Sequence, residues 1–183
     1  VEKYDHIIYI EDARIQGPSN KHIAGIRIAR GNYLYMPDDD DFLTCENYLS
    51  RVEKIFRTNP SVTFVAANVN ILQDRDGSVL ESYRLGFSGI QKGMDFLQNF
   101  RKPISVVTGV FRRDVFEVWP SEYMLDLSDT CLYLYALLYG DAYIMEDVVA
   151  NYRVSKHSTT HQCPRENIIN GLKQKEIIYK IAN

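Results

Sequence analysis

Residues 31–41 read Gly-Asn-Tyr-Leu-Tyr-Met-Pro-Asp-Asp-Asp-Asp, so four consecutive aspartates directly follow an apolar run. The run predicts a buried strand over residues 33–36 that ends at the aspartates. Like charges this close repel one another, and a bound cation is the usual reason for such a cluster. Carboxylate oxygens suit Mg²⁺ or Mn²⁺, which commonly bind one or two carboxylates together with substrate phosphates. A solvated acidic loop is the alternative interpretation.

Strand and helix patterns alternate on either side of this segment. An apolar run predicts a strand over residues 6–10, and the spacing of Ile23, Ile26 and Ala29 predicts a helix over 22–29 that Gly31 ends. A second helix is expected to begin after Thr44, as its N-cap, and to end at residues 59–60. This order indicates an α/β layer with a largely parallel sheet.

The rest of the chain is expected to continue in one domain over residues 1–183, because no linker or internal repeat is visible. The patterns predict a strand over 62–72, a turn at 74–77, a return strand over 79–85, a helix over 91–100, a strand over 104–111, a short helix over 112–116, a helix over 130–139 closed by Gly140, extended segments over 142–144 and 148–152, and a final helix over 165–181.

Composition limits the classes of function. The 183 residues are 45% hydrophobic and 25% charged, as in an ordinary globular domain, and the net charge of −3 does not suggest nucleic-acid binding. Three widely separated cysteines, Cys45, Cys131 and Cys163, argue against a disulfide framework and indicate a reducing compartment. We therefore expect a cytoplasmic protein, which could act at the inner face of a membrane.

Taken in order, these segments resemble the family-2 glycosyltransferases. Residues 31–41 look like the family segment in which a glycine precedes a strand ending in Asp-x-Asp-Asp, the DXD motif of the GT-A fold. The segments that resemble the family's other conserved parts are Asn20–Ala29 (the preceding helix), Thr108–Arg113 (a later strand), Asp129–Leu134 with Gly140 (the Glu-Asp helix) and Val148–Arg153 (a strand ending in Tyr-Arg). Together they span Tyr4 to Ser158.

The sequence departs from the family pattern at several points. Ile23 lies near a position that is usually Asn, and Ser128 stands where the family carries Glu. The Gln-x-x-Arg-Trp motif of processive synthases is absent, and the single tryptophan is Trp119, which disfavours a processive enzyme. Family members begin with a strand–helix–strand unit that holds the nucleoside base. Nothing before His6 could supply it, so we expect this chain to lack that unit.

The resemblance implies a GT-A-like fold, a mixed and mainly parallel sheet flanked by helices. It implies a non-processive, inverting, hexosyltransferase-like enzyme that uses Mn²⁺ or Mg²⁺. The expected donor is a nucleotide sugar, with a UDP-sugar favoured, and the expected acceptor is a saccharide or another hydroxyl compound. Polysaccharide biosynthesis is the expected setting.

The resemblance also assigns roles on the donor side. It makes Asp40 the direct metal ligand, while Asp38 faces the nucleotide sugar or a metal-bound water. Asp39 and Arg153 are expected to contact the donor. Because side chains alternate along an extended segment, Asp38 and Asp40 are expected to share one face, and Asp39 and Asp41 the other. A capping or solvated carboxylate is the alternative for Asp39 and Asp41, and a surface ion pair is the alternative for Arg153.

On the acceptor side the match assigns Asp129 as the base that takes the proton of the attacking hydroxyl. The helix dipole favours an anion at this position but does not make it a base, and a helix N-cap is the alternative. Asp126, in the same loop, is the reserve candidate. His157 could complete the metal site, although a solvated loop histidine is the alternative.

Two other functions remain open from the sequence. A transferase-like module could bind or assemble with a partner without turnover, and an acidic cluster could serve a metal-dependent phosphohydrolase. The apolar stripe of the final helix could pack on the body of the protein, form a homodimer contact or lie on a membrane surface.

Overall fold

The computed structural model describes residues 7–11, 17–73, 75–98, 103, 106–117, 128–155 and 165–182. The elements in chain order are α1 (Gly17–Ile28), β1 (Tyr33–Tyr35), β2 (Phe42–Leu43), α2 (Tyr48–Thr58), β3 (Val62–Gln73), β4 (Val79–Tyr83), β5 (Gly89–Gln91), α3 (Gly93–Gln98), the 3₁₀ helix η1 (Val106–Thr108), β6 (Val110–Arg112), α4 (Asp114–Glu117), α5 (Asp129–Tyr139), β7 (Asp141–Val154) and α7 (Arg165–Ala182).

The sheet has seven strands, with the order β1-β6-β3-β7-β2, while β4 pairs with β3 and β5 pairs with β7. Among the described strands only β3 and β7 pair in parallel, and every other pair is antiparallel. The mixed α/β class is therefore confirmed, but the expected share of parallel pairing was too high. A tight turn joins β3 directly to β4, and such short connections permit only antiparallel neighbours.

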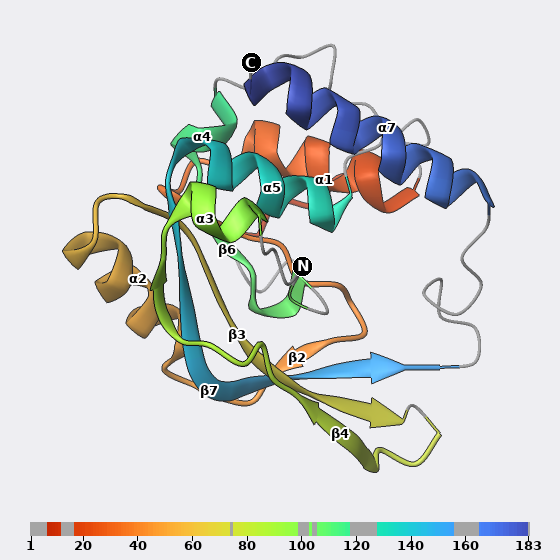
Figure 1. Cartoon of the computed structure of the whole chain (residues 1–183). Coiled ribbons are helices and arrows are strands. Elements are labelled where there is room, and N and C mark those ends of the chain that lie inside the picture. The colour runs from red at the N-terminus through yellow and green to blue at the C-terminus, as the bar shows by residue number, and fades with distance from the viewer. Residues whose placement is uncertain are drawn as a thin grey trace.

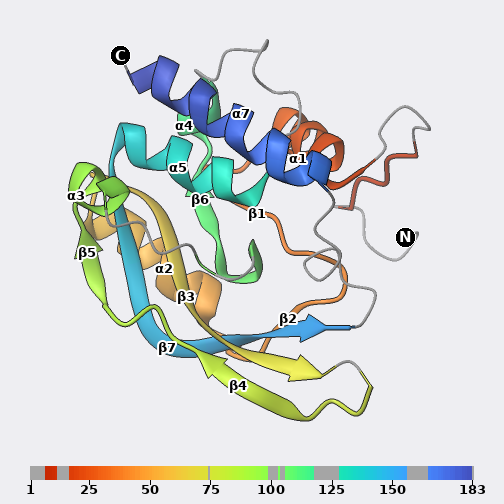
Figure 2. The same cartoon turned by 45° about the vertical axis from the view of Figure 1, so that its right-hand side comes forward.

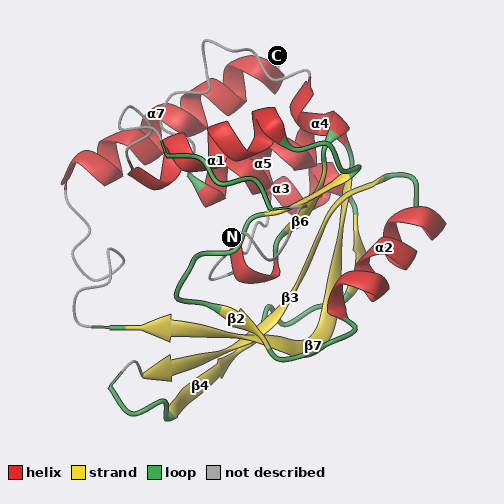
Figure 3. Ribbon diagram, turned by 180° about the vertical axis from the view of Figure 1, so that it is seen from behind, coloured by secondary structure: helices red, strands yellow, loops and turns green. Residues whose placement is uncertain are grey.

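Helices cover both faces of this sheet. Phe64 and Ala66 of β3 belong to a buried cluster with α1, α3, α4, α5 and α7, whereas Val65 and Ala67 belong to a second cluster with α2. Successive side chains of a strand point to opposite faces, so β3 supplies both clusters. Figure 1 and Figure 3 show α2 separated from the other helices by the long strands β3 and β7.

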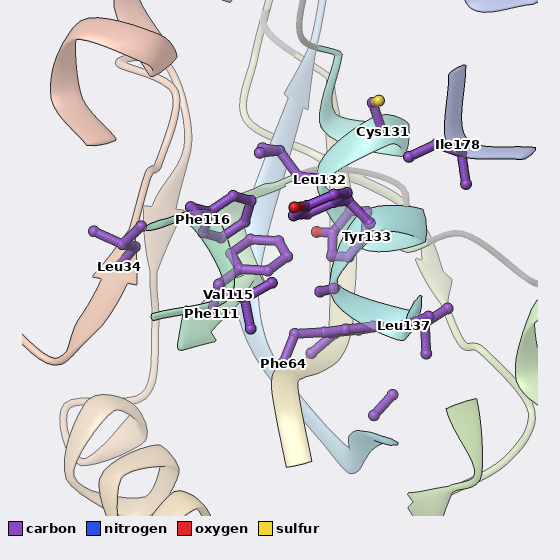
Figure 4. Close-up of a cluster of buried hydrophobic side chains, with 14 of the residues drawn as sticks. Leu34, Phe64, Phe111, Val115, Phe116, Cys131, Leu132, Tyr133, Leu137 and Ile178 are labelled. Carbon is purple, nitrogen blue, oxygen red and sulfur yellow. The ribbon is translucent and has the colours of Figure 1, made fainter. Parts of the chain in front are cut away.

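An aromatic group in the first cluster joins β3, β6 and α5. The ring centroids of Phe64 and Phe111 lie 5.8 Å apart, and that of Tyr133 lies 5.1 Å and 5.2 Å from them (Figure 4). Aromatic pairs at such distances add about 0.5–1.5 kcal/mol beyond their area burial. Leu34 of β1 packs in the same cluster, so the strand before the aspartates is attached to α5 through this core.

The strand β7 bends strongly along its length, as Figure 2 shows. Its register with β3 shifts on both sides of Asn68, leaving residues 146, 147 and 149 outside the pairing. The buried side chain of Asn68 forms hydrogen bonds with backbone groups at this irregularity. Its amide donates to the Glu146 carbonyl at 2.7 Å, and its side-chain oxygen accepts from the Leu85 N–H at 2.9 Å. The sequence predicted two separate segments here, whereas the structure has one continuous strand with a bulge.

Several predicted elements are confirmed. The strands over 62–72 and 79–85 form the β3–β4 hairpin, whose turn includes Gly77 at a φ of 69°. The helix closed by Gly140 is α5, and the final helix is α7. None of the described helices is both long enough and apolar enough to cross a membrane.

Other element predictions were wrong. Residues 7–11 form no strand and are exposed, and His6 lies outside the described residues. Thr44 is not a helix cap, because residues 42–43 pair with β7 and α2 begins only after Asn47. Within the strand expected over 104–111, residues 106–108 form η1 and residues 110–111 belong to β6, while 104–105 lie outside the described residues. Apolar runs this short do not distinguish a strand from other buried conformations.

Candidate active site

The aspartate cluster follows β1 but does not continue it. The strand ends at Tyr35, Asp38 lies in coil, and Asp39 and Asp40 form a turn. All three of these aspartates are exposed. The extended backbone from which alternate aspartates were expected to share a face is therefore absent at residues 38–40, and side chains alternate only along an extended segment.

Asp41 connects the cluster to the end of β7. One of its carboxylate oxygens accepts a hydrogen bond from the backbone N–H of Arg153 at 3.0 Å. The adjacent residue Phe42 pairs with Asn151, which extends the same connection. Arg153, the predicted donor-binding arginine, therefore lies beside the acidic segment, although its role there stays a prediction.

Asp129 is the first residue of α5, and it is not the helix cap. The N-cap is Ser128, whose hydroxyl oxygen accepts from the Cys131 N–H at 3.3 Å. The same hydroxyl donates to the side-chain oxygen of Gln174 in α7. Asp129 accepts from the Thr130 N–H at 2.8 Å. The N-cap alternative for Asp129 is thus wrong, because its neighbour fills that position.

The folded chain brings Asp129 close to the acidic segment. Protein atoms around the Asp38 carboxyl group displace water, and this desolvation raises its pKa, although the residue as a whole is exposed. The charges of Asp40, Asp129 and Asp39 raise that pKa further, in this order of importance. Two carboxylates predicted to serve the donor side and the acceptor side of a reaction are therefore close enough for their charges to interact, one after the end of β1 and one at the start of α5.

Two further side chains at this place were not singled out from the sequence. Burial lowers the pKa of His22 in α1, and the negative charge of Asp129 partly offsets this by raising it. The His22 Nδ1 is shielded from solvent and has no hydrogen-bond partner. Burial also raises the pKa of Tyr133 well above its ordinary value, and the charges of Asp129 and Asp38 add to this effect. No local pattern marks His22, and Tyr133 itself lies within the apolar run of α5.

A glycine makes room for Tyr133 beneath the site. A Cβ atom built on Gly109 would lie 2.7 Å from the Tyr133 hydroxyl oxygen, closer than real Cβ contacts come. Gly109 was an indirect sequence signal for this contact, because an isolated glycine within a predicted buried strand often marks the close approach of another group.

The donor set fits a divalent cation that also binds phosphate. Within the described ranges, no three Asp, Glu, His or Cys side chains are grouped closely enough to hold a metal by themselves. Magnesium sites, however, often use only one or two carboxylates and take their other ligands from substrate phosphates and water. Asp38 and Asp40 provide two such carboxylates, whose mutual repulsion a cation would relieve.

Two candidates lie outside the described residues. These are Asp126, the reserve base, and His157, the additional metal ligand. Their positions relative to Asp38 and Asp129 therefore remain predictions.

A groove of about 380 Å³ lies on the α2 side of β1, lined by residues that include Tyr33, Tyr35, Leu49 and Glu53. None of the predicted site residues lines it. A catalytic site is identified by its reactive side chains and not by the volume of a groove. The acidic segment and the start of α5 therefore remain the candidate active site.

Comparison with known proteins identifies the family of the chain. A family model described as glycosyl transferase family 2 matches residues 1–119 of the 183-residue chain. The matched range includes all four aspartates of the acidic segment and ends before Asp129. No curated protein matches the chain.

Proposed function

The chain belongs to glycosyltransferase family 2, and from this premise we propose that it moves one sugar from a nucleotide-sugar donor to a hydroxyl group of an acceptor, with inversion at the anomeric carbon. Binding of a nucleotide sugar and an acceptor is general to the family. The single observation that supports the specific reaction is the proximity of Asp129 to Asp38, because it joins a candidate base to a candidate donor site.

On the donor side, Asp38 and Asp40 would hold Mn²⁺ or Mg²⁺, with Asp39 and Arg153 contacting the donor. A divalent cation supplies positive charge that stabilises a departing diphosphate. The raised pKa of Asp38 comes first from desolvation and then from the charges of Asp40, Asp129 and Asp39, and it supports this role because a bound cation would stabilise the ionised carboxylate. We favour a UDP-sugar as the donor and a saccharide as the acceptor.

On the acceptor side, the Asp129 carboxylate would accept the proton of the attacking hydroxyl group. A new bond forms between the acceptor oxygen and the anomeric carbon as the bond from that carbon to the donor phosphate breaks. The bonding electrons leave with the nucleoside diphosphate, and the proton remains on Asp129. One displacement of this kind inverts the anomeric configuration.

The helix α5 is suited to hold such a base. Its N-terminus is capped by Ser128, and its buried residues, such as Leu132 and Tyr133, attach it to the core. Ser128 makes the capping bond, and the Asp129 carboxylate accepts a separate hydrogen bond from the Thr130 N–H. A rigid helix that presents a carboxylate beside the donor would restrict the position of the acceptor hydroxyl group.

The proposal is tested by measuring sugar transfer from a panel of nucleotide sugars to saccharide acceptors, with Mn²⁺ present or removed by chelation. We expect metal-dependent transfer that Asp40→Ala reduces at least about 100-fold. Asp76→Ala is the matched control, since Asp76 is an exposed aspartate in the β3–β4 turn. Equal turnover in Asp40→Ala and the parent would reject the metal role.

The products of the same reactions separate this proposal from phosphate hydrolysis. A glycosylated acceptor with inverted configuration supports transfer, whereas release of phosphate without a glycosylated product favours a phosphohydrolase. Calorimetric titration with UDP and Mn²⁺ adds a test of binding. Metal-dependent binding without any transfer would favour a module that binds but does not turn over substrate.

A further inference from the structure

The helix α7 exposes an apolar stripe on the side that faces away from the protein. Ile168, Leu172 and Tyr179 are 55%, 62% and 70% exposed, and Ile169 is 39% exposed. These four residues are called the outer stripe below. On the opposite side of the helix, Gln174 and Ile178 are buried against the body. Figure 1 and Figure 2 show α7 as an outer helix, lying across α5 and α1.

Ile168, Ile169 and Leu172 of the outer stripe are neighbours on one helical face, and the exposed Lys175 lies between Leu172 and Tyr179. Side chains four positions apart lie on the same side of a helix, which places Leu172 next to Ile168, and Tyr179 lies on the same side two turns further. Single exposed apolar side chains need no explanation, but a contiguous apolar patch marks a contact surface. The packing of Gln174 and Ile178 shows that α7 already has its intramolecular contact on its other face.

The charges of α7 indicate what covers the outer stripe. The helix contains Arg165, Lys173, Lys175 and Lys180 against only Glu166 and Glu176, a net charge of +2 in a chain whose net charge is −3. Arg165, Lys173 and Lys175 are exposed. Glu176 is paired with Lys180 at 2.8 Å, which neutralises one of the two acidic side chains. Basic charge is thus concentrated on the helix that carries the exposed apolar face.

We propose that α7 lies on the surface of a membrane that contains anionic phospholipids. Apolar side chains inserted among lipid headgroups, with lysines reaching the phosphates around them, form the usual arrangement of an interfacial helix. Tyr179 suits this setting, because its ring has an apolar body and a polar tip. A second copy of the chain is a poorer partner, because two faces of the same positive charge would meet.

This surface is separate from the chemistry at Asp38 and Asp129, so the two proposals can fail independently. Sugar transfer in solution measures the first, and partitioning to vesicles without any substrate measures the second. The helices are nevertheless linked, because Gln174 of α7 accepts a hydrogen bond from Ser128, the cap of the helix that carries Asp129.

The test is co-sedimentation of the full chain with vesicles of phosphatidylcholine, with and without phosphatidylglycerol, at low and high salt. We expect binding to the anionic vesicles that falls as salt rises. Ile168→Ser with Leu172→Ser, and separately Lys173→Glu with Lys175→Glu, should each reduce the partition coefficient at least about tenfold. Lys54→Glu with Arg75→Glu is the matched control, because it makes the same change in net charge at exposed residues away from α7.

Several outcomes would overturn the proposal. They are no binding to anionic vesicles, equal binding to neutral vesicles, or loss of binding in the Lys54 and Arg75 control as large as in the α7 variants. Sedimentation velocity provides a further test, since a dimer that Ile168→Ser with Leu172→Ser dissociates would assign the outer stripe to a second copy. Circular dichroism of each variant confirms that its fold is kept, as expected for substitutions at exposed positions.

Discussion

The carboxyl groups of Asp38, just after β1, and Asp129, in the first turn of α5, interact electrostatically: desolvation and the charge of Asp40 raise the pKa of Asp38, and the charge of Asp129 raises it further. These two carboxylates come from distant parts of the chain, and the same Asp129 charge also acts on His22 and Tyr133. Among the described residues, the charges that shift Asp38 are those of Asp40, Asp129 and Asp39, and all three raise its pKa. Such concentrations of like charge are common at functional sites.

Replacing Asp38 with Asn should make the protein more stable and less active. The pKa of Asp38 is higher in the folded than in the unfolded chain, so its ionised form costs stability at pH values above its ordinary pKa. We expect Asp38→Asn to raise Tm at pH 7 by about 1–3 °C, and to lower transfer at least about 100-fold. The stability difference should shrink as the pH falls, because both side chains are then neutral. A lower Tm for the variant at pH 7 would contradict this account.

Substitutions at Asp129 and Ser128 should affect catalysis and helix stability separately. We expect Asp129→Asn to lower kcat by about 10²–10⁴-fold while the donor KM changes little, because only proton transfer is lost. Ser128→Ala should instead cost about 1 kcal/mol of stability through the lost cap. Steady-state kinetics and urea unfolding distinguish the two effects. If Asp126→Asn abolishes turnover and Asp129→Asn does not, the base is Asp126.

Gly109→Ala should destabilise the core beneath the site, because the added methyl group would meet the Tyr133 hydroxyl oxygen at 2.7 Å. We expect a loss of about 1–3 kcal/mol in the free energy of unfolding. In a Tyr133→Phe background the nearest clash is absent, so Gly109→Ala should cost less there. Urea unfolding of the four members of this double-mutant cycle measures the coupling. Equal costs in both backgrounds would show that the Tyr133 hydroxyl group is not the obstacle.

Asp141 should make the fold sensitive to acid. Burial alone would raise the pKa of Asp141, but bonds from Lys92 at 2.9 Å, the Gly93 N–H at 3.0 Å and Ser61 at 2.9 Å outweigh it and lower that pKa. A carboxyl group with a lowered folded-state pKa contributes stability above its unfolded pKa, and this contribution is lost as the pH falls through the folded value.

We therefore expect Asp141→Asn to cost about 1–3 kcal/mol at pH 7, with a smaller difference from the parent below pH of about 4. Urea unfolding across this pH range measures both effects. Asp147→Asn is a suitable comparison, because Asp147 forms a solvent-exposed pair with Arg51 and should cost less than about 1 kcal/mol. A constant difference between Asp141→Asn and the parent at all pH values would show that ionisation of Asp141 is not involved.

Local patterns predicted the elements that need no distant partner to be recognised. The β3–β4 hairpin followed from a β-branched and apolar run, a turn with Gly77 and a return strand, and α5 followed from an apolar run closed by Gly140. Strand predictions that depended on pairing were less successful. Residues 7–11 have a strand-like composition but form no strand, and β7 continues through a bulge that Asn68 stabilises from another strand.

The sequence by itself determined that four carboxylates follow a strand and that an apolar helix begins close to Asp129, because strand ends and apolar runs are local properties. Only the tertiary structure decided that the charge of Asp129 acts on Asp38, His22 and Tyr133, and that α7 buries Ile178 while exposing Leu172. The reason is physical: such contacts depend on sheet pairing and core packing between distant segments, whose energies no short stretch of sequence contains.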